Sequence, residues 1–241
     1  MIPASMRTST TPAARAGRGA RRRQETRARL VGAARTLMAK KGIDATSIQE
    51  ITDTADVGFG SFYNHFPSKE AIADAVLEHA IESFGAAADH VRDLVEDPAE
   101  VVAASTRHAV RRAAADQGWG WFLIRTGLQR ADALHHGLGR RLARDIQVGV
   151  DAGRFAVDDH PAATLAAAGT VLAICAARLH GTIGADAPER AATLLLRLLG
   201  VTPAEARRIA RRPLPTITLP EPLTPKPAPP ARPAKRRGAL S

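Results

Sequence analysis

Apolar side chains recur at the spacing of an α-helix through most of this chain, and that periodicity constrains the fold more than any other feature. The first predicted helix shows it on one stripe of residues: Leu30, Val31, Ala34, Leu37 and Met38. These positions stand at i, i+1, i+4, i+7 and i+8, and Gly42 ends the helix. No alternating pattern with hairpin turns competes with it. The sequence therefore predicts an all-α protein.

Capping signals mark where further helices begin. Residues Ser47-Ile-Gln-Glu50 form a capping box, in which the serine hydroxyl accepts from a free amide while the carboxylate reaches back. This predicts a short helix that closes near Asp56. A longer helix of about 27 residues, or about 40 Å, is predicted from Ser68. Later starts combine a capping oxygen with proline in the first turn: Asp97-Pro98, Asp159-His-Pro161 and Thr202-Pro203.

The net charge of +10 lies entirely on the two ends of the chain. Residues 1–23 carry six arginines and no acid, and residues 213–241 carry five basic side chains against Glu221. The second segment also holds nine of the sixteen prolines, which lack an amide donor and resist helix. We therefore expect a basic disordered arm over 1–23 and a basic, proline-rich disordered tail over 213–241. Such ends attract polyanions such as nucleic acid, or serve only solubility.

The composition of the chain indicates the cellular compartment in which it works. The single Cys175 excludes a disulfide framework. Residues 1–23 lack the apolar core of a secretory signal, although a transit peptide is a compositional alternative. No stretch of 18 or more residues lacks charges and turns, so no membrane-spanning segment is predicted. These features predict a cytoplasmic protein without a membrane partner.

Four of the chain's few aromatic residues stand in "VGFGSFYNHF", residues 57–66. A capped helix over 47–55, a turn containing Gly58 and a second short helix near 59–65 would form a helix-turn-helix, whose second helix enters the major groove of DNA. Phe62 and Phe66 are four apart and are expected to anchor that helix to its neighbours. Tyr63 can then reach a phosphate. The side chain of Asn64 suits a contact to adenine, or is simply exposed.

The segment "TSIQEITDTADVGFGSFYNHFPSKEAI" resembles the DNA-binding region of the TetR family of transcriptional regulators. The matching residues are Thr46-Ser47, Ile51, Val57, Gly60-Ser61-Phe62-Tyr63, His65-Phe66 and Ser68-Lys69-Glu70, and "RARLVGAARTLMAKKGIDATS" resembles the family's first helix. Weaker similarity covers "DIQVGVDAGRF" in the second half. Asp56 stands where the family often has Gly, and Phe59 where it often has Lys. The resemblance implies a DNA-binding domain over 24–84, with its helix-turn-helix at about 47–66, and a ligand-binding and dimerisation domain over 85–212.

The expected DNA-binding domain has no net charge of its own, because residues 24–70 hold six basic and six acidic side chains. Its phosphate contacts must therefore come from helix N-termini and hydroxyls, with the arm supplying charge along the backbone or in the minor groove. Ser47 would serve as a cap, as a phosphate contact, or as both. The predicted DNA-binding residues are Arg22, Arg23, Thr46, Ser47, Gly60, Ser61, Tyr63, Asn64, His65 and Lys69.

The second half is rich in Ala and Leu over residues 160–181 and 189–201. Two such helices from each subunit would form a four-helix dimer interface, unless they form an intramolecular core instead. The segment 118–125 concentrates both tryptophans near two glycines. The predicted ligand-binding residues are Phe84, His108, Trp121, Phe122, Arg125, Gln129 and Cys175. Few of them are polar, which favours a mostly apolar effector.

Signals for catalysis or metal binding are weak. Cys175 and His180 are five apart on one predicted helix and would diverge by about 140°. Zinc-ligand spacing and a Walker loop are absent from the sequence. We therefore expect no catalytic residue, no metal and no cofactor. The predicted function is a homodimeric repressor that a small-molecule effector releases from its DNA operator. A constitutive DNA-binding dimer and an enzyme with an appended DNA-binding domain stay open as alternatives.

Overall fold

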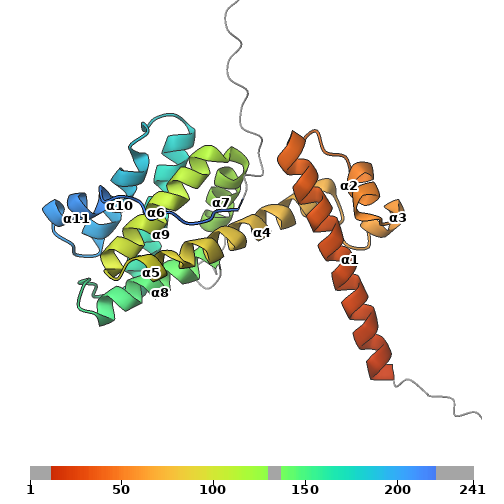
Figure 1. Cartoon of the computed structure of the whole chain (residues 1–241), viewed down its shortest axis with the longest axis horizontal. Helices are drawn as coiled ribbons and strands as arrows, with labels where there is room; N and C mark the ends of the chain where they lie inside the picture. The colour runs from red at the N-terminus through yellow and green to blue at the C-terminus, as the bar shows by residue number, and fades with distance from the viewer. Residues whose placement is uncertain (1–11, 130–136, 221–241) are drawn as a thin grey trace, which may run out of the picture.

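The computed structural model describes residues 12–129 and 137–220, and within these ranges the secondary structure is helical without strands. Two groups of helices are joined by α4 (Figure 1). The described helices are α1 Pro12–Lys41, α2 Ile48–Ala55, α3 Phe59–Phe62, α4 Lys69–Asp89, α5 Val91–Leu94, α6 Pro98–Ala115, α7 Gln117–Gln129, α8 Gly137–Asp151, α9 His160–Leu179, α10 Ala187–Leu198 and α11 Pro203–Ala210. The all-α prediction is confirmed.

The first helix is longer than the sequence pattern predicted. Residues 12–23 were expected to belong to a disordered arm, but they continue α1 as a helix of 30 residues. The physical reason lies in the composition of this segment. Ala and Arg are among the strongest helix formers, and Pro12 stands at the first helical position, where its missing amide costs nothing. Residues 1–11 lie outside the described part of the chain.

The helix α2 packs on α1 and α3 packs on α2, while α1 also packs on α4. Ser47 caps α2 by the predicted capping box, in which its side chain accepts from the Glu50 amide and the Glu50 carboxylate accepts from the Ser47 amide. Asp56 follows α2 in the left-handed region, with φ of 50°, which turns the chain toward α3. The helix α3 is a single turn, shorter than the predicted 59–65, and residues 63–65 continue it as turns.

The helix α4 connects the two groups of helices. The predicted domain boundary between residues 84 and 85 falls within this helix, and the boundary stays a prediction. Ser68 caps it by accepting from the Ala71 amide. The predicted helix of about 27 residues is interrupted at His90. The chain bends there because fully buried Val91 packs against Val101 and Ala104 of α6.

The remaining helices form a bundle in which α6 and α10 pack closely together, with α7, α8 and α9 around them (Figure 1). Its core contains Ile146, Phe155, Leu195 and Leu199, all buried. The helix α9 has a mean hydropathy of 1.7 and is long enough to cross a membrane by length and composition. The prediction that no such stretch exists is therefore wrong as a statement about composition. An apolar helix that is only partly buried equally suits a contact with another protein chain.

Residues 213–220 are extended and lie along α6, and we call this segment the strap. The whole tail from residue 213 was predicted to be disordered and outside any packed core. That prediction is wrong for the strap, in which Leu214 and Ile217 pack against Val91 and Val101. Proline excludes helix here but not packing, since an extended chain can still bury alternate side chains. Residues 221–241 lie outside the described part of the chain.

Candidate DNA interface and effector pocket

The short helix α3 is held in place by buried rings. Phe62 is fully buried and Phe66 is nearly so, and their ring centroids lie 5.8 Å apart. The Arg27 guanidinium of α1 lies over the Phe66 ring, 4.9 Å from its centroid. A helix of four residues cannot hold itself, so these contacts fix its orientation. The predicted anchoring role of Phe62 and Phe66 agrees with this packing.

The outer side of the same segment presents polar groups to solvent. Ser61 and Asn64 are exposed, and Tyr63 is 51% exposed with its ring edge-on to Phe62 and Phe59. An added Cβ at Gly60 would meet nothing within 4 Å, so a phosphate backbone could approach the chain closely there. Four predicted DNA-binding residues thus lie on one accessible surface.

Arginines from α1 border this surface. The Arg23 guanidinium donates to the backbone carbonyl of Asn64 at 3.0 Å, and a shallow surface hollow lies between Arg22, Arg23 and His65. Burial lowers the pKa of His65 below its usual value, and the charges of Arg23 and Arg27 lower it further. Neutral His65 can therefore donate or accept a hydrogen bond at neutral pH.

Other cations of this domain are already engaged. Lys41 pairs with Glu50, and this contact, followed by the hydrogen bonds from Ser47, lowers the Glu50 pKa to about 2. The Lys69 ammonium donates to the Asp44 carbonyl at 3.0 Å, and Arg29 donates to the Asp56 carbonyl at 3.4 Å. Both acceptors are neutral, so these cations keep their charge near the surface.

One predicted DNA-binding residue is not available to DNA through its side chain. Thr46 is 1% exposed, and its hydroxyl donates to the Gly42 carbonyl at 2.8 Å. The hydroxyl closes the turn between α1 and α2, and a buried donor that loses its acceptor is costly. We therefore withdraw the Thr46 side chain from the predicted interface, whereas Ser47 is exposed at the N-terminus of α2.

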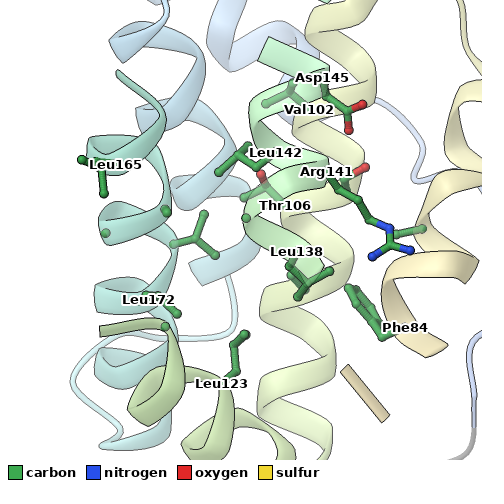
Figure 2. Close-up of a pocket in the computed structure, with 18 of the residues that line it drawn as sticks. Phe84, Val102, Thr106, Leu123, Leu138, Arg141, Leu142, Asp145, Leu165 and Leu172 are labelled. Carbon is green, nitrogen blue, oxygen red and sulfur yellow. The ribbon is translucent and has the colours of Figure 1, made fainter. Parts of the chain in front are cut away.

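A cavity of about 570 Å³ lies inside the helical bundle (Figure 2). Five helices, α4, α6, α7, α8 and α9, contribute to its wall. Most of the lining is apolar: Phe84, Ala88, Val102, Ala109, Leu123, Leu138, Leu142, Leu165, Val171 and Leu172. A cavity of this size and character fits a small molecule rather than a macromolecule.

The polar part of the wall lies where α8 faces α4 (Figure 2). Arg141 of α8 donates from Nε to Asp89 at 2.9 Å and from Nη2 to Glu82 at 2.8 Å. A Cβ added to Gly85 would meet the Arg141 guanidinium at 2.7 Å, so glycine makes room for that side chain. Arg144 also donates to Asp89, at 2.7 Å. The pocket wall therefore contains an ionic link to α4.

The pKa values of two carboxylates in this group are shifted in opposite directions. Burial alone would raise the pKa of Asp89, but hydrogen bonds from Arg144 and Arg141 outweigh it and hold that pKa below its usual value. Burial raises the pKa of Asp145, and only Arg144 counters it strongly. Asp145 accepts from Arg144 through Oδ1 at 3.0 Å. Because Asp145 also lines the pocket, its carboxylate is a candidate acceptor for a hydrogen bond from a ligand.

Of the six predicted ligand-binding residues whose side chains the structure describes, only Phe84 lies in this wall. His108 is turned to the strap, where its ring bonds to the Pro215 carbonyl at 3.0 Å. Arg125 pairs with Asp74 at 2.7 Å, and Trp121 is exposed against His180. Phe122 and Cys175 are buried in the core beside the pocket. Gln129 ends α7, and its side chain lies outside the described part.

The polar pocket residues Arg141 and Asp145 were not predicted, although the sequence around them carries a recognisable pattern. Arg141 and Asp145 are four apart on α8, and the apolar residues Leu138, Leu142 and Ile146 follow the same spacing beside them. Charges interleaved with an apolar stripe stand at the edge of a buried face, where they need partners. Their placement in the pocket itself depends on α4, which is distant in sequence.

This geometry defines a helix-turn-helix protein with a second, helical domain that encloses a ligand-sized pocket. Residues 30–76 match the family model described as bacterial regulatory proteins, tetR family, and residues 97–212 match the tetracyclin repressor-like C-terminal domain. A crystal structure of RolR in complex with resorcinol is 44% identical, with a TM-score of 0.70, and the match covers 83% of this chain and all of that one. The chain belongs to the TetR family of transcriptional regulators.

Curated relatives match over shorter stretches of the chain. The repressor KstR2 of Rhodococcus jostii is 43% identical over 51 residues, which are 21% of this chain and 25% of that protein. KstR2 of Mycolicibacterium smegmatis is 33% identical over 71 residues, or 30% and 35% of the two chains. The chain thus matches these curated relatives over about a third of their length or less. RolR without ligand is 42% identical, with a TM-score of 0.66, over 79% of this chain and all of that one.

Proposed function

We propose that this protein is a homodimeric transcriptional repressor that a small, hydroxylated aromatic effector releases from its DNA operator. The observation that carries the proposal is the ionic link from the pocket wall to α4, the helix that begins at the DNA-binding domain. A molecule bound in the pocket can act on that helix directly.

The DNA-binding half of the proposal uses the exposed surface of α3 and the turn that follows it. Ser61, Tyr63 and Asn64 would meet base edges and phosphates in the major groove, while Arg22 and Arg23 would contact the adjacent backbone. The N-termini of α2 and α4 would bind phosphates, with Ser47 and Lys69 beside them.

A dimer would present two such surfaces to one face of DNA. In the bundle, α9 and α10 expose Leu165, Leu194 and Leu198, large apolar side chains that water solvates poorly. A second copy packed on these helices would cover them and form the expected four-helix interface. The two recognition helices must then lie about 34 Å apart to enter successive major grooves. Such a DNA-binding dimer would work in the cytoplasm.

The effector's chemistry follows from the pocket wall. The mostly apolar lining favours a hydrocarbon ring, and the polar margin at Arg141 and Asp145 favours hydroxyl groups on it. Asp145 would accept from a hydroxyl, and Thr106, which also lines the cavity, could bond a second one (Figure 2). The similar protein RolR is known in complex with resorcinol, a ring of this kind.

Release would result from a shift of α4. A ligand hydroxyl that bonds Asp145 or Arg141 alters the contacts of Arg141 with Asp89 and Glu82. A tilt of α4 would then move the recognition helices away from the spacing that DNA requires. The alternative of a constitutive dimer would be favoured by a filled bundle, whereas a cavity of about 570 Å³ favours the ligand-responsive protein.

The proposal is tested with the protein's own upstream DNA and with resorcinol as the probe. Fluorescence anisotropy should show tight, sequence-dependent binding that resorcinol weakens tenfold or more. Calorimetry should show one resorcinol site for each chain. Binding of resorcinol without any change in operator affinity would rule out the coupling, and absence of binding would rule out this effector class.

A further inference from the structure

The charged side chains of the pocket wall lie together at one margin. Among the described residues of the wall they are Asp89 of α4 and Arg141 and Asp145 of α8. The rest of the described lining is apolar, glycine, or the hydroxyls of Ser105 and Thr106. In this wall a ligand therefore meets charge only where α8 faces α4 (Figure 2).

Every nitrogen of the Arg141 guanidinium already donates to the protein. The group is turned toward α4 (Figure 2), where Nε donates to Asp89 at 2.9 Å. Nη2 and Nη1 donate to the two carboxylate oxygens of Glu82 at 2.8 Å and 3.1 Å, and Nη1 also donates to the Gly137 carbonyl at 3.3 Å. This bidentate pair occupies the fork of donors with which arginine would otherwise hold the carboxylate of a ligand.

The arginines next to Arg141 are engaged by the same carboxylates. Arg144 donates to Asp145 at 3.0 Å and to Asp89 at 2.7 Å, and Arg92 of α5 pairs with Asp89 at 3.4 Å. Arg140 is exposed and does not line the cavity. The linked group is formally neutral, since its three arginines match its three carboxylates: Arg92, Arg141, Arg144, Glu82, Asp89 and Asp145.

A ligand with a negative charge would be at a disadvantage here. Its carboxylate would lie beside Asp89 and Asp145, and it would either displace one of them from an arginine or stay unpaired in a mostly apolar cavity. Burial already raises the pKa of Asp145, so a second negative charge beside it would meet the same penalty. A neutral hydroxyl or amide avoids this penalty, because it can donate to the carboxylates. The hydroxyls of Ser105 and Thr106 suit charged and neutral groups alike.

We infer that the pocket selects effectors by charge: it admits neutral hydroxylated aromatic molecules, and Asp89 and Asp145 exclude aromatic acids of the same size. This inference rests on the proposed function, since it takes an aromatic effector as the ligand of this cavity. The two carboxylates determine specificity by repelling the wrong ligand, in addition to any contact they make with the right one. Arg141 would attract an acid by itself, but Asp89 and Glu82 already neutralise it.

The test uses three probes that share one ring: resorcinol, 3,5-dihydroxybenzamide and 3,5-dihydroxybenzoate. The amide and the acid have nearly the same size and shape, and at neutral pH they differ in charge. Calorimetry with the full chain should show that the amide binds about a hundredfold or more tighter than the acid, because an unpaired charge is costly to bury. An affinity ratio near one would overturn the inference.

Two variants test whether the carboxylates are the cause. Asp89→Asn and Asp145→Asn each remove one negative charge with little change in shape, so each should reduce the ratio of amide to acid affinity by about tenfold or more. Asp151→Asn makes the same change at an exposed position of α8 outside the cavity, and it should leave the ratio unchanged. An unchanged ratio in both pocket variants would show that charge does not exclude the acid, and would overturn the inference.

Operator affinity measured with the same probes separates this inference from the proposed function. If the acid binds as tightly as the amide while resorcinol weakens operator binding, the inference is overturned and the proposed function stands. If the acid is excluded but bound resorcinol leaves operator affinity unchanged, the inference stands and the proposed function fails.

Discussion

Arg141 of α8 donates from Nε to Asp89 of α4 at 2.9 Å, across the wall of the effector pocket. The contact is mostly shielded from water, because the Arg141 side chain is only 12% exposed. Two hydrogen-bonded carboxylates, Glu82 and Asp89, raise the pKa of Arg141 above its usual value, so its charge is constant. This pair joins the polar margin of the pocket to α4, the helix that begins at the DNA-binding domain and whose Phe84 and Ala88 also line the cavity.

Changing Arg141 to Met should weaken both the effector site and the bundle. We expect resorcinol affinity to fall tenfold or more, and stability to fall by about 1 to 2 kcal/mol because Asp89 and Glu82 lose a partner that is partly buried. Thermal melts and calorimetry provide the measurement. Arg125→Met is the matched control, since it breaks the exposed pair with Asp74 between α7 and α4. Equal effects from both variants would contradict a special role for Arg141.

Filling the pocket should produce a repressor that no longer responds. A Cβ at Gly169 of α9 would meet nothing within 4 Å, and this residue lines the cavity. We therefore expect Gly169→Leu to keep operator affinity and lose the resorcinol response, whereas Gly169→Ala should retain both. Anisotropy with and without resorcinol measures the response, and gel filtration checks the dimer. A full response in Gly169→Leu would place the effector elsewhere.

The pair of Arg112 with Asp116 should be costly to break. Asp116 is fully buried, accepts from Arg112 at 3.2 Å and accepts from the Trp119 amide at 3.3 Å. Asp116→Ala leaves a buried cation, for which the expected loss is about 3 to 5 kcal/mol. Asp186→Ala breaks the exposed pair of Asp186 with Arg190 at the same helical spacing and should cost less than about 1 kcal/mol. Denaturant unfolding of the two variants compares them directly.

Acid should loosen the start of α2. The folded pKa of Glu50 is lowered to about 2 from an ordinary value of 4.5. A lowered carboxylate pKa contributes stability that is full above the ordinary value and is lost as the pH falls toward the folded value. Hydrogen exchange at α2 should therefore accelerate between about pH 4.5 and about pH 2, apart from the intrinsic pH effect. Lys41→Met should shrink this change, and an unchanged profile in that variant would contradict the assignment.

Removing the Tyr63 hydroxyl should weaken operator binding without affecting the fold. The ring is half exposed and packs edge-on against Phe62, which Tyr63→Phe preserves. A hydrogen bond to a charged phosphate is worth about 1.5 to 3 kcal/mol, so affinity should fall about tenfold or more. The loss should be similar for different DNA sequences. An unchanged affinity would exclude the predicted phosphate contact.

Local patterns in the sequence predicted the helices well. The capping box at Ser47 and the buried pair Phe62 and Phe66 could be read directly, because caps and helical stripes depend on residues a few positions apart. The long helix from Ser68 was also evident, although its break at His90 was not. That break depends on the packing of Val91 against α6, a contact with no local signature.

The residues that line the pocket could not be predicted from the composition of the sequence. Aromatic residues such as Trp121 suggested that α7 lines the pocket. In the structure these residues are either exposed, as Trp121 is, or buried in the core, as Phe122 is. The polar residues of the wall come from α8 and α4, more than fifty positions apart, and their meeting depends on the space left by Gly85. The strap was missed for a similar reason, since its proline content indicates an extended chain but not the partner that holds it.

The central claim is that occupancy of the pocket controls DNA binding through α4. The most direct measurement is operator affinity of the full chain and of Arg141→Met, each with and without saturating resorcinol. We expect the full chain to lose affinity tenfold or more with resorcinol and the variant to lose much less at the same occupancy. Equal affinities with and without bound resorcinol in the full chain would contradict the account.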